Sequence, residues 1–138
     1  MHYLGWALIA LVGYSIFTPL ASLAMNNAPS SVVATVANGI LLLSAVSLAL
    51  YENESVTTYF TGRTALYMVG AGVFLAVGIL AYYRALAAGP VSVVTPVYAM
   101  FLVGSTVLSV LFLDDSLTLQ KGAGIALAVV AVYLTVTG

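Results

Sequence analysis

Apolar residues fill five long blocks of the chain, and short polar segments separate the blocks. A helix that crosses a bilayer needs roughly 20 mostly apolar residues, so each block is long enough for one crossing. The pattern predicts an all-α integral membrane protein, with one transmembrane domain over residues 1–138. The predicted spans are residues 3–25, 31–51, 65–87, 91–113 and 120–137.

The polar segments between the blocks contain residues that end and begin helices. Residues 26–31 (NNAPSS) form a predicted turn, and residues 52–63 (ENESVTTYFTGR) are the longest polar stretch. Residues 87–90 (AAGP) stop one helix with Gly and start the next with Pro, and residues 114–121 (DDSLTLQK) form the last connection. Because the connections are short, neighbouring spans are antiparallel, and five crossings put the two termini on opposite sides.

Composition excludes a soluble globular domain. Hydrophobic residues make up 63% of the chain and charged residues only 5%, whereas soluble domains carry about 25% charged residues. A formal net charge of −1 without a basic patch argues against a nucleic-acid partner. The absence of cysteine excludes a disulfide framework and Cys-ligated zinc.

Lysine and arginine residues give a small orientation bias. Arg63 and Lys121 lie on the N-terminal side of the predicted spans, and Arg84 lies on the other side. Because Lys and Arg mark the cytoplasmic side, the bias predicts an N-terminus in the cytoplasm of a cell-membrane protein. The margin is one residue, so insertion in both orientations stays open.

Polar residues gather on one face of the first, second and fourth spans when they are placed at 100° per residue. The faces could converge on a hydrated substrate path. Alternatively, Ser and Thr allow close helix packing and form hydrogen bonds between helices, at about 0.6 kcal/mol each. The candidate path residues on these faces are Ser15, Thr18, Ser22, Thr35, Asn38, Ser92, Thr95, Tyr98, Ser105 and Thr106.

Two prolines lie inside predicted spans, Pro19 in the first and Pro96 in the fourth. Each removes one backbone donor and frees a carbonyl one turn earlier, those of Ser15 and Ser92. One interpretation is a static kink. The other is that both prolines belong to the substrate path, as bends at which a helix moves or exposes backbone to a ligand.

Arg84 lies near the end of the third span, beside Tyr82 and Tyr83. Its side chain can reach the membrane interface, where tyrosines are also common. In the alternative interpretation, Arg84 and the two tyrosines line the mouth of the substrate path, and the guanidinium pairs with an anionic substrate group.

No Asp, Glu, His or Lys lies in the middle of any predicted span. Proton relays, metal sites and intramembrane hydrolases place such residues there, so the sequence predicts no metal, no cofactor and no enzymatic activity. The last span instead carries small residues at helical spacing, which are typical of a helix-packing or dimerisation face. These predicted dimerisation residues are Gly122, Gly124 and Ala126.

Residues 81–134 resemble the second part of an EamA repeat of the drug/metabolite transporter superfamily. Two departures stand out: the first two spans lack the Lys and Arg that members often carry there, and Asp115 replaces the usual Glu. The residues that carry the resemblance are Tyr83, Ala85, Leu86, Gly89, Pro90, Ser92, Val94, Pro96, Phe112, Leu113, Asp115, Leu117, Thr118 and Gly124.

The resemblance implies secondary transport of small metabolites or drugs, often by efflux. Typical members have ten helices in two inverted repeats with the site between them, and this chain has one repeat, like the half-size members. The resemblance therefore implies a homodimer in the lipid bilayer, antiparallel in the ideal case, or a pair with a second half-size chain. The alternative hypothesis is a non-transporting membrane subunit that packs with a larger partner.

Overall fold

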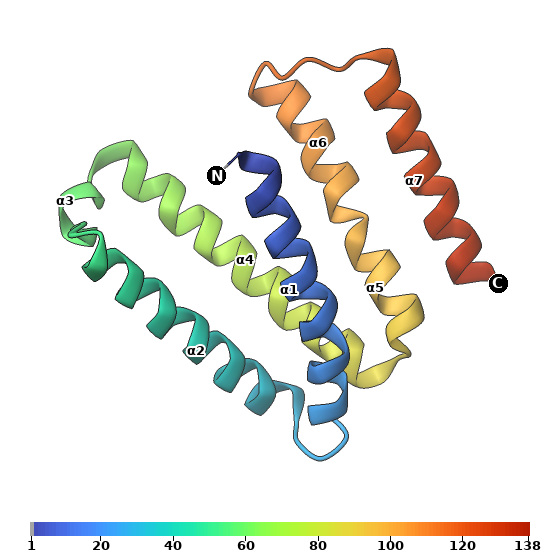
Figure 1. Ribbon diagram of the computed structural model, residues 1–138, viewed down its shortest axis with the longest axis horizontal. Coiled ribbons are helices and arrows are strands. Elements are labelled where there is room, and N and C mark those ends of the chain that lie inside the picture. The colour runs from blue at the N-terminus through green and yellow to red at the C-terminus, as the bar shows by residue number, and fades with distance from the viewer. Residues whose placement is uncertain (1) are drawn as a thin grey trace. The chain divides into compact units, whose positions relative to one another are not determined.

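The regular structure of the chain is helical throughout the part that the computed structural model describes, residues 2–138, and no strand occurs there. Figure 1 shows the order of the helices along the chain. The helices are α1 (Tyr3–Ala24), α2 (Ser30–Tyr51), α3 (Val56–Tyr59), α4 (Gly62–Ala88), α5 (Val91–Ala99), α6 (Phe101–Phe112) and α7 (Leu119–Thr137).

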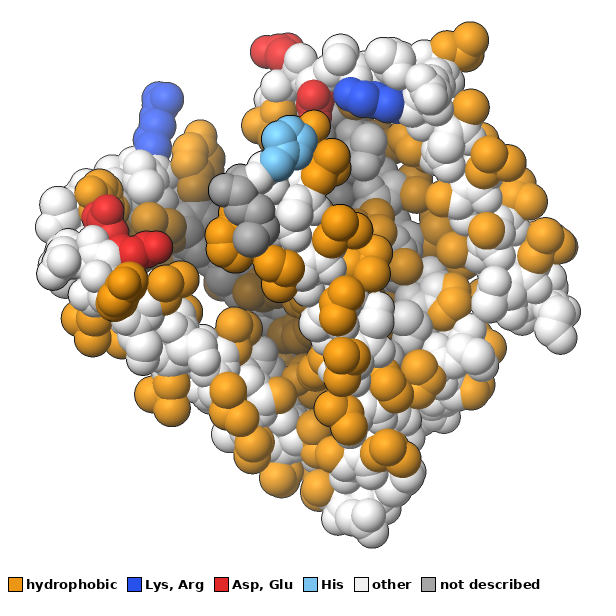
Figure 2. All heavy atoms as spheres, viewed as in Figure 1, with side chains coloured by type: hydrophobic (Ala, Val, Ile, Leu, Met, Phe, Trp, Pro, Cys, Tyr) orange, Lys and Arg blue, Asp and Glu red, His pale blue; other side chains and the backbone are white. Residues whose placement is uncertain are grey.

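Five segments are long and apolar enough to cross a membrane, which confirms the predicted fold class. They are α1, α2, α4, the combined segment Val91–Phe112, and α7. Large apolar side chains lie exposed along them, as Figure 2 shows; Leu43 and Phe74, for example, are 70% and 81% exposed. In a bilayer such side chains face lipid, so their exposure is what a membrane-spanning helix requires.

The helix boundaries follow the predicted ones closely, with two differences. The sequence analysis did not predict the short helix α3, which lies inside the polar stretch between α2 and α4. The fourth span is also not one helix, because Met100 separates α5 from α6.

Backbone conformation explains where two of the connections begin. Asn53 follows α2 with φ 57°, and Asp114 follows α6 with φ 54°. Asn and Asp tolerate this left-handed conformation better than most residues, so both positions suit the end of a helix. Lys121 then donates its backbone N–H to the Thr118 hydroxyl at 3.2 Å, which caps the start of α7.

Contacts between helices divide the chain into two units, and the boundary falls at the predicted Gly-Pro turn between Ala88 and Gly89. In the first unit, α4 packs against both α2 and α1. In the second unit, Gly89–Gly138, α7 packs against α5 and α6. The predicted single domain over residues 1–138 therefore stays a prediction.

Candidate functional site

A buried hydrogen bond joins α1 to α4. The Thr18 and Tyr82 hydroxyl oxygens are 3.1 Å apart, and each residue is only 4% exposed. Thr18 donates its hydroxyl proton to the Tyr14 carbonyl at 3.0 Å, so the Tyr82 hydroxyl is the donor to Thr18. We call this contact, with the aromatic residues described next, the α1–α4 seam.

Aromatic rings complete the α1–α4 seam. Tyr83 is 2% exposed and meets Phe17 edge to face, with ring centroids 5.8 Å apart. Phe17 meets Tyr14 in the same way at 5.9 Å. Edge-to-face pairs stabilise packing beyond the area that they bury. Thr18 and Tyr83, both predicted to lie on the substrate path, thus help to hold α1 against α4.

A groove of about 320 Å³ lies between α2 and α4. We call it the α2–α4 groove. Its volume is in the range of pockets that bind small molecules, and most of its lining is apolar. The lining residues are Ala34, Thr35 and Asn38 from α2, and Gly72, Leu75, Ala76, Ile79 and Leu80 from α4.

Asn38 is the residue of the α2–α4 groove whose side-chain amide keeps both a donor and an acceptor that form no hydrogen bond within residues 2–138. Its side-chain nitrogen donates to the Ala34 carbonyl at 2.8 Å, which leaves the second N–H and the amide oxygen for a ligand. Asn38 lies eight residues after Ser30, the start of the 22-residue helix α2. At 1.5 Å per residue it is about 12 Å from that end, close to the middle of a helix roughly 33 Å long.

The hydroxyl groups on the predicted polar faces mostly bond to their own helices. Such bonds use the hydroxyl proton locally, so a polar face of Ser and Thr residues does not require a water-filled cavity. The hydroxyls of Ser15 and Thr35 donate to carbonyls four residues back, at 2.7 Å each, Thr106 does so at 2.8 Å, and Ser105 donates to a carbonyl three residues back at 3.1 Å.

The fourth span has an irregular backbone. Met100 donates its N–H to the Val97 carbonyl, three residues back, at 3.1 Å, whereas a continuous α-helix would use the Pro96 carbonyl, four residues back. Pro96 itself has no N–H, so the Ser92 carbonyl also loses the donor of a regular helix. These two carbonyls are four residues apart and therefore lie on one face of α5.

The interruption lies near the middle of the fourth candidate span. Met100 is nine residues after Val91 in a 22-residue span, or about 14 Å along a segment roughly 33 Å long. The predicted bend at Pro96 stays a prediction, and the structure adds an interruption of the helix one turn later, at Met100. Irregular backbone at such depth is tolerated only where protein or a water-filled cavity satisfies it.

The lining of the α2–α4 groove does not include the other predicted path residues. Pro19 is exposed within α1, which stays helical through it, and Ser22 is half-buried. Arg84 is exposed four residues before the end of α4, a depth from which its side chain can reach the interface. Ser92 is also exposed.

In the second unit, the Tyr98 ring packs against Phe101 across the interruption, with centroids 5.1 Å apart and the ring planes tilted by 47°. Tyr98 is half-buried, as are Thr95 and Pro96. Polar or aromatic side chains and irregular backbone thus occur together in α5.

Sequence reasoning missed the α4 wall of the groove. Gly72 and Ala76 are four residues apart, so they share a helix face. This small-residue spacing is the same as that of Gly122 and Ala126, which predicts a helix-packing or dimerisation face on α7. The spacing on α4 was the signal that could have located the groove.

The comparison with known families decides the identity. The chain matches the model described as "EamA-like transporter family" over residues 1–137. The chain belongs to the EamA-like transporter family. Membership indicates a membrane transporter of the drug/metabolite superfamily, and it confirms the resemblance of residues 81–134.

An uncharacterized protein of Methanocaldococcus jannaschii is 30% identical to this EamA-like chain over 94 residues. The matched region covers 68% of this chain and 66% of that relative, so the two chains have nearly equal lengths. The match spans just under two thirds of the relative. No solved structure matches the chain.

The EamA-like chain has no cluster of three or more His, Cys, Asp or Glu side chains that could hold a metal ion within residues 2–138. The first unit offers the Asn38 amide and the hydroxyl of Thr35 in the α2–α4 groove, and the second unit offers the aromatic side chains and backbone carbonyls of α5. These groups can bind a small molecule by hydrogen bonds and apolar contact.

Proposed function

We propose that this EamA-like protein is a secondary carrier that exports small, partly apolar metabolites or drugs across the cell membrane by alternating access. The α2–α4 groove carries the proposal. An apolar groove with one free amide near the membrane midplane suits a small molecule that has an apolar body and a hydrogen-bonding group.

The interrupted fourth span supports the same function. Transporters commonly place substrate or ion sites near the bilayer midplane, where broken helices expose backbone groups. The Ser92 and Pro96 carbonyls are such groups, because proline and the turn at Met100 remove their usual donors. We infer that Thr95, Pro96 and Tyr98 belong to the path.

Two copies of the chain would build the complete carrier, one of them inverted in the membrane. Family carriers use two repeats of opposite orientation, which exchange conformations around a central site, and this chain contains one family domain. The small Lys and Arg bias allows insertion in both orientations. A second half-size chain is the alternative partner.

Helix α7 is the proposed pairing surface. A methyl group added at Gly122 would meet no atom within 4 Å in the chain. Ala126 lies four residues later, on the same face of α7, so a helix of a second copy can approach this face closely. Gly124, the third predicted dimerisation residue, lies two residues from each and lines a groove on the other side of α7.

Asn38→Leu should lower substrate flux about tenfold, because the amide offers up to two hydrogen bonds worth about 1 kcal/mol each. Purified protein in liposomes loaded with a defined mixture of amino acids and small aromatic metabolites gives the flux, with mass spectrometry of the released compounds. The matched control is Ser44→Leu on α2, where an exposed hydroxyl bonds only to the Ile40 carbonyl.

The two outcomes that contradict the proposal differ in meaning. If wild-type liposomes release nothing faster than protein-free liposomes, the chain alone is not a carrier of these compounds, and the subunit hypothesis gains support. If the wild type transports and Asn38→Leu transports equally well, the chain is a carrier whose path does not use the α2–α4 groove.

A further inference from the structure

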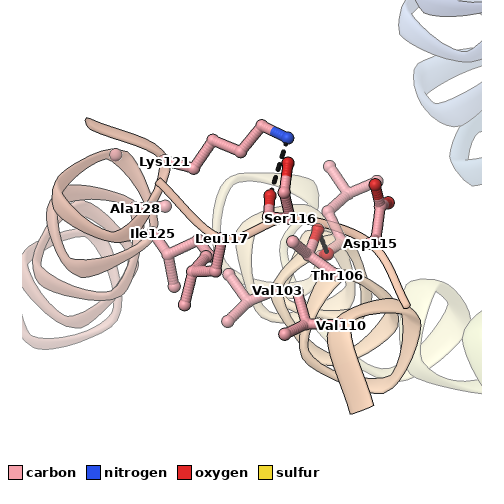
Figure 3. A pocket seen from close by; sticks show the side chains of 11 residues that line it. Val103, Thr106, Val110, Asp115, Ser116, Leu117, Lys121, Ile125 and Ala128 are labelled. Atoms are coloured by element: carbon pink, nitrogen blue, oxygen red, sulfur yellow. Dashed lines mark hydrogen bonds between the residues drawn. The ribbon is translucent and has the colours of Figure 1, made fainter. Parts of the chain in front are cut away.

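A second groove, of about 490 Å³, lies in the other unit between α6, α7 and the segment that connects them. We call it the α6–α7 groove. Figure 3 shows Val103, Leu117 and Ile125 facing one another across it. The remaining lining residues are Leu102, Thr106, Val110, Asp115, Ser116, Lys121, Gly124 and Ala128.

The α6–α7 groove extends about one lipid leaflet into the membrane. Leu102 lies ten residues before Phe112, and Ala128 lies nine residues after Leu119. At 1.5 Å per residue the groove therefore reaches about 15 Å from the helix ends, which is half of a hydrocarbon core roughly 30 Å thick. Its floor is mostly apolar, with Thr106 as the polar residue at depth, and its charged residues, Asp115 and Lys121, lie at the interface end.

The interface end of the groove carries one cation and one anion, each held by a neutral group. The Lys121 ammonium donates to the Ser116 carbonyl at 2.9 Å, a contact drawn in Figure 3. The Asp115 carboxylate accepts from the Ser109 hydroxyl at 2.8 Å. Both charged side chains are exposed, so each can also meet a charge on a ligand.

We propose that the α6–α7 groove binds one phosphatidylethanolamine molecule. An acyl chain would lie between α6 and α7, the lipid phosphate would contact Lys121, and the primary ammonium would contact Asp115. This headgroup matches the two charges of the rim. Phosphatidylglycerol lacks the cation, and the quaternary ammonium of phosphatidylcholine has no N–H to donate to the carboxylate.

Native mass spectrometry of the purified full-length protein tests the site. Dioleoyl-phosphatidylethanolamine, dioleoyl-phosphatidylcholine and dioleoyl-phosphatidylglycerol are added at equal concentration, and the bound lipid is counted per chain. We expect one phosphatidylethanolamine, retained about fivefold over the other two, which is the scale of one exposed ion pair. Equal retention of the three lipids, or a preference for phosphatidylglycerol, overturns the proposal.

Rim variants test the two headgroup contacts. Lys121→Gln keeps a donor for the Ser116 carbonyl and removes the charge that meets phosphate, so it should weaken retention of all three lipids. Asp115→Asn keeps an acceptor for Ser109 and removes the charge that meets ammonium, so it should abolish the preference among headgroups. If Lys121→Gln retains the lipids as well as the wild type does, or if Asp115→Asn keeps the wild-type headgroup preference, the assignment of the rim is wrong.

Filling the groove tests the acyl-chain contact. Gly124→Leu places a side chain in the groove, and Gly78→Leu on α4 is the matched control; added Cβ atoms at both glycines meet nothing within 4 Å. Gly124→Leu should lose the lipid, and Gly78→Leu should retain it. Equal retention by the two variants overturns the proposal. The proposal is also overturned if the wild type shows no headgroup preference and Gly124→Leu loses a dimer that the wild type forms. A second copy of the chain, and not a lipid, would then occupy the groove.

Discussion

Replacing Tyr83 with alanine should lower the free energy of unfolding by about 3 kcal/mol, the usual scale for removing a buried aromatic side chain. Tyr83 is 2% exposed and packs edge to face on Phe17, so the change leaves a cavity where α4 meets α1. Unfolding in mixed micelles by added SDS, followed by circular dichroism, measures the change.

Tyr133→Ala is the matched control for Tyr83→Ala. Tyr133 is 66% exposed on α7, so its replacement should change the free energy of unfolding by less than about 0.5 kcal/mol. Equal effects of the two substitutions would mean that the α1–α4 seam does not stabilise the protein.

Pro96→Ala should lower substrate flux about tenfold while it raises stability. Alanine supplies the N–H that the Ser92 carbonyl lacks, and it is about 3 kcal/mol more favourable than proline inside a helix. The variant should thus regularise the fourth span and withdraw a backbone carbonyl from the path. Liposome flux and SDS unfolding measure the two effects.

Pro29→Ala is the control for Pro96→Ala, since Pro29 precedes α2 outside the spans. It should leave flux unchanged and stability within about 0.5 kcal/mol of wild type. If the Pro96→Ala variant is both more stable and fully active, the interrupted fourth span is not part of the transport mechanism.

The sequence predicts the five spans well because membrane burial imposes a length and a polarity that are visible in any window of about 20 residues. It does not predict α3, because four residues, Val56–Tyr59, are too few for a helical period to appear. It also does not predict the interruption of the fourth span at Met100. Proline marks the missing donor in the sequence, whereas the changed hydrogen bond is at Met100.

The candidate site is less predictable than the spans. Helical periodicity puts Thr18, Thr35 and Thr106 on polar faces, but it cannot say where their hydroxyl protons go, and all three donate to carbonyls of their own helices. The free hydrogen-bonding capacity of Asn38 depends on side-chain geometry. The wall formed by Gly72 on α4 depends on which helices pack together.

The membrane orientation of the chain is the most direct test of the paired, inverted carrier. The chain has no cysteine, so Asn27→Cys before α2 and Glu54→Cys after α2 each give one probe, on opposite sides of the membrane. Glu54 is preferable to Asn53, whose φ of 57° disfavours cysteine. The probes are labelled in intact and in permeabilised cells with a membrane-impermeant maleimide.

Insertion in both orientations predicts that about half of the molecules label in intact cells at each position. Permeabilised cells should label fully at both, which shows that the probes are reactive. Nearly complete labelling at one position with protection at the other would show a single orientation. That result would contradict the antiparallel homodimer on which the proposed carrier is built.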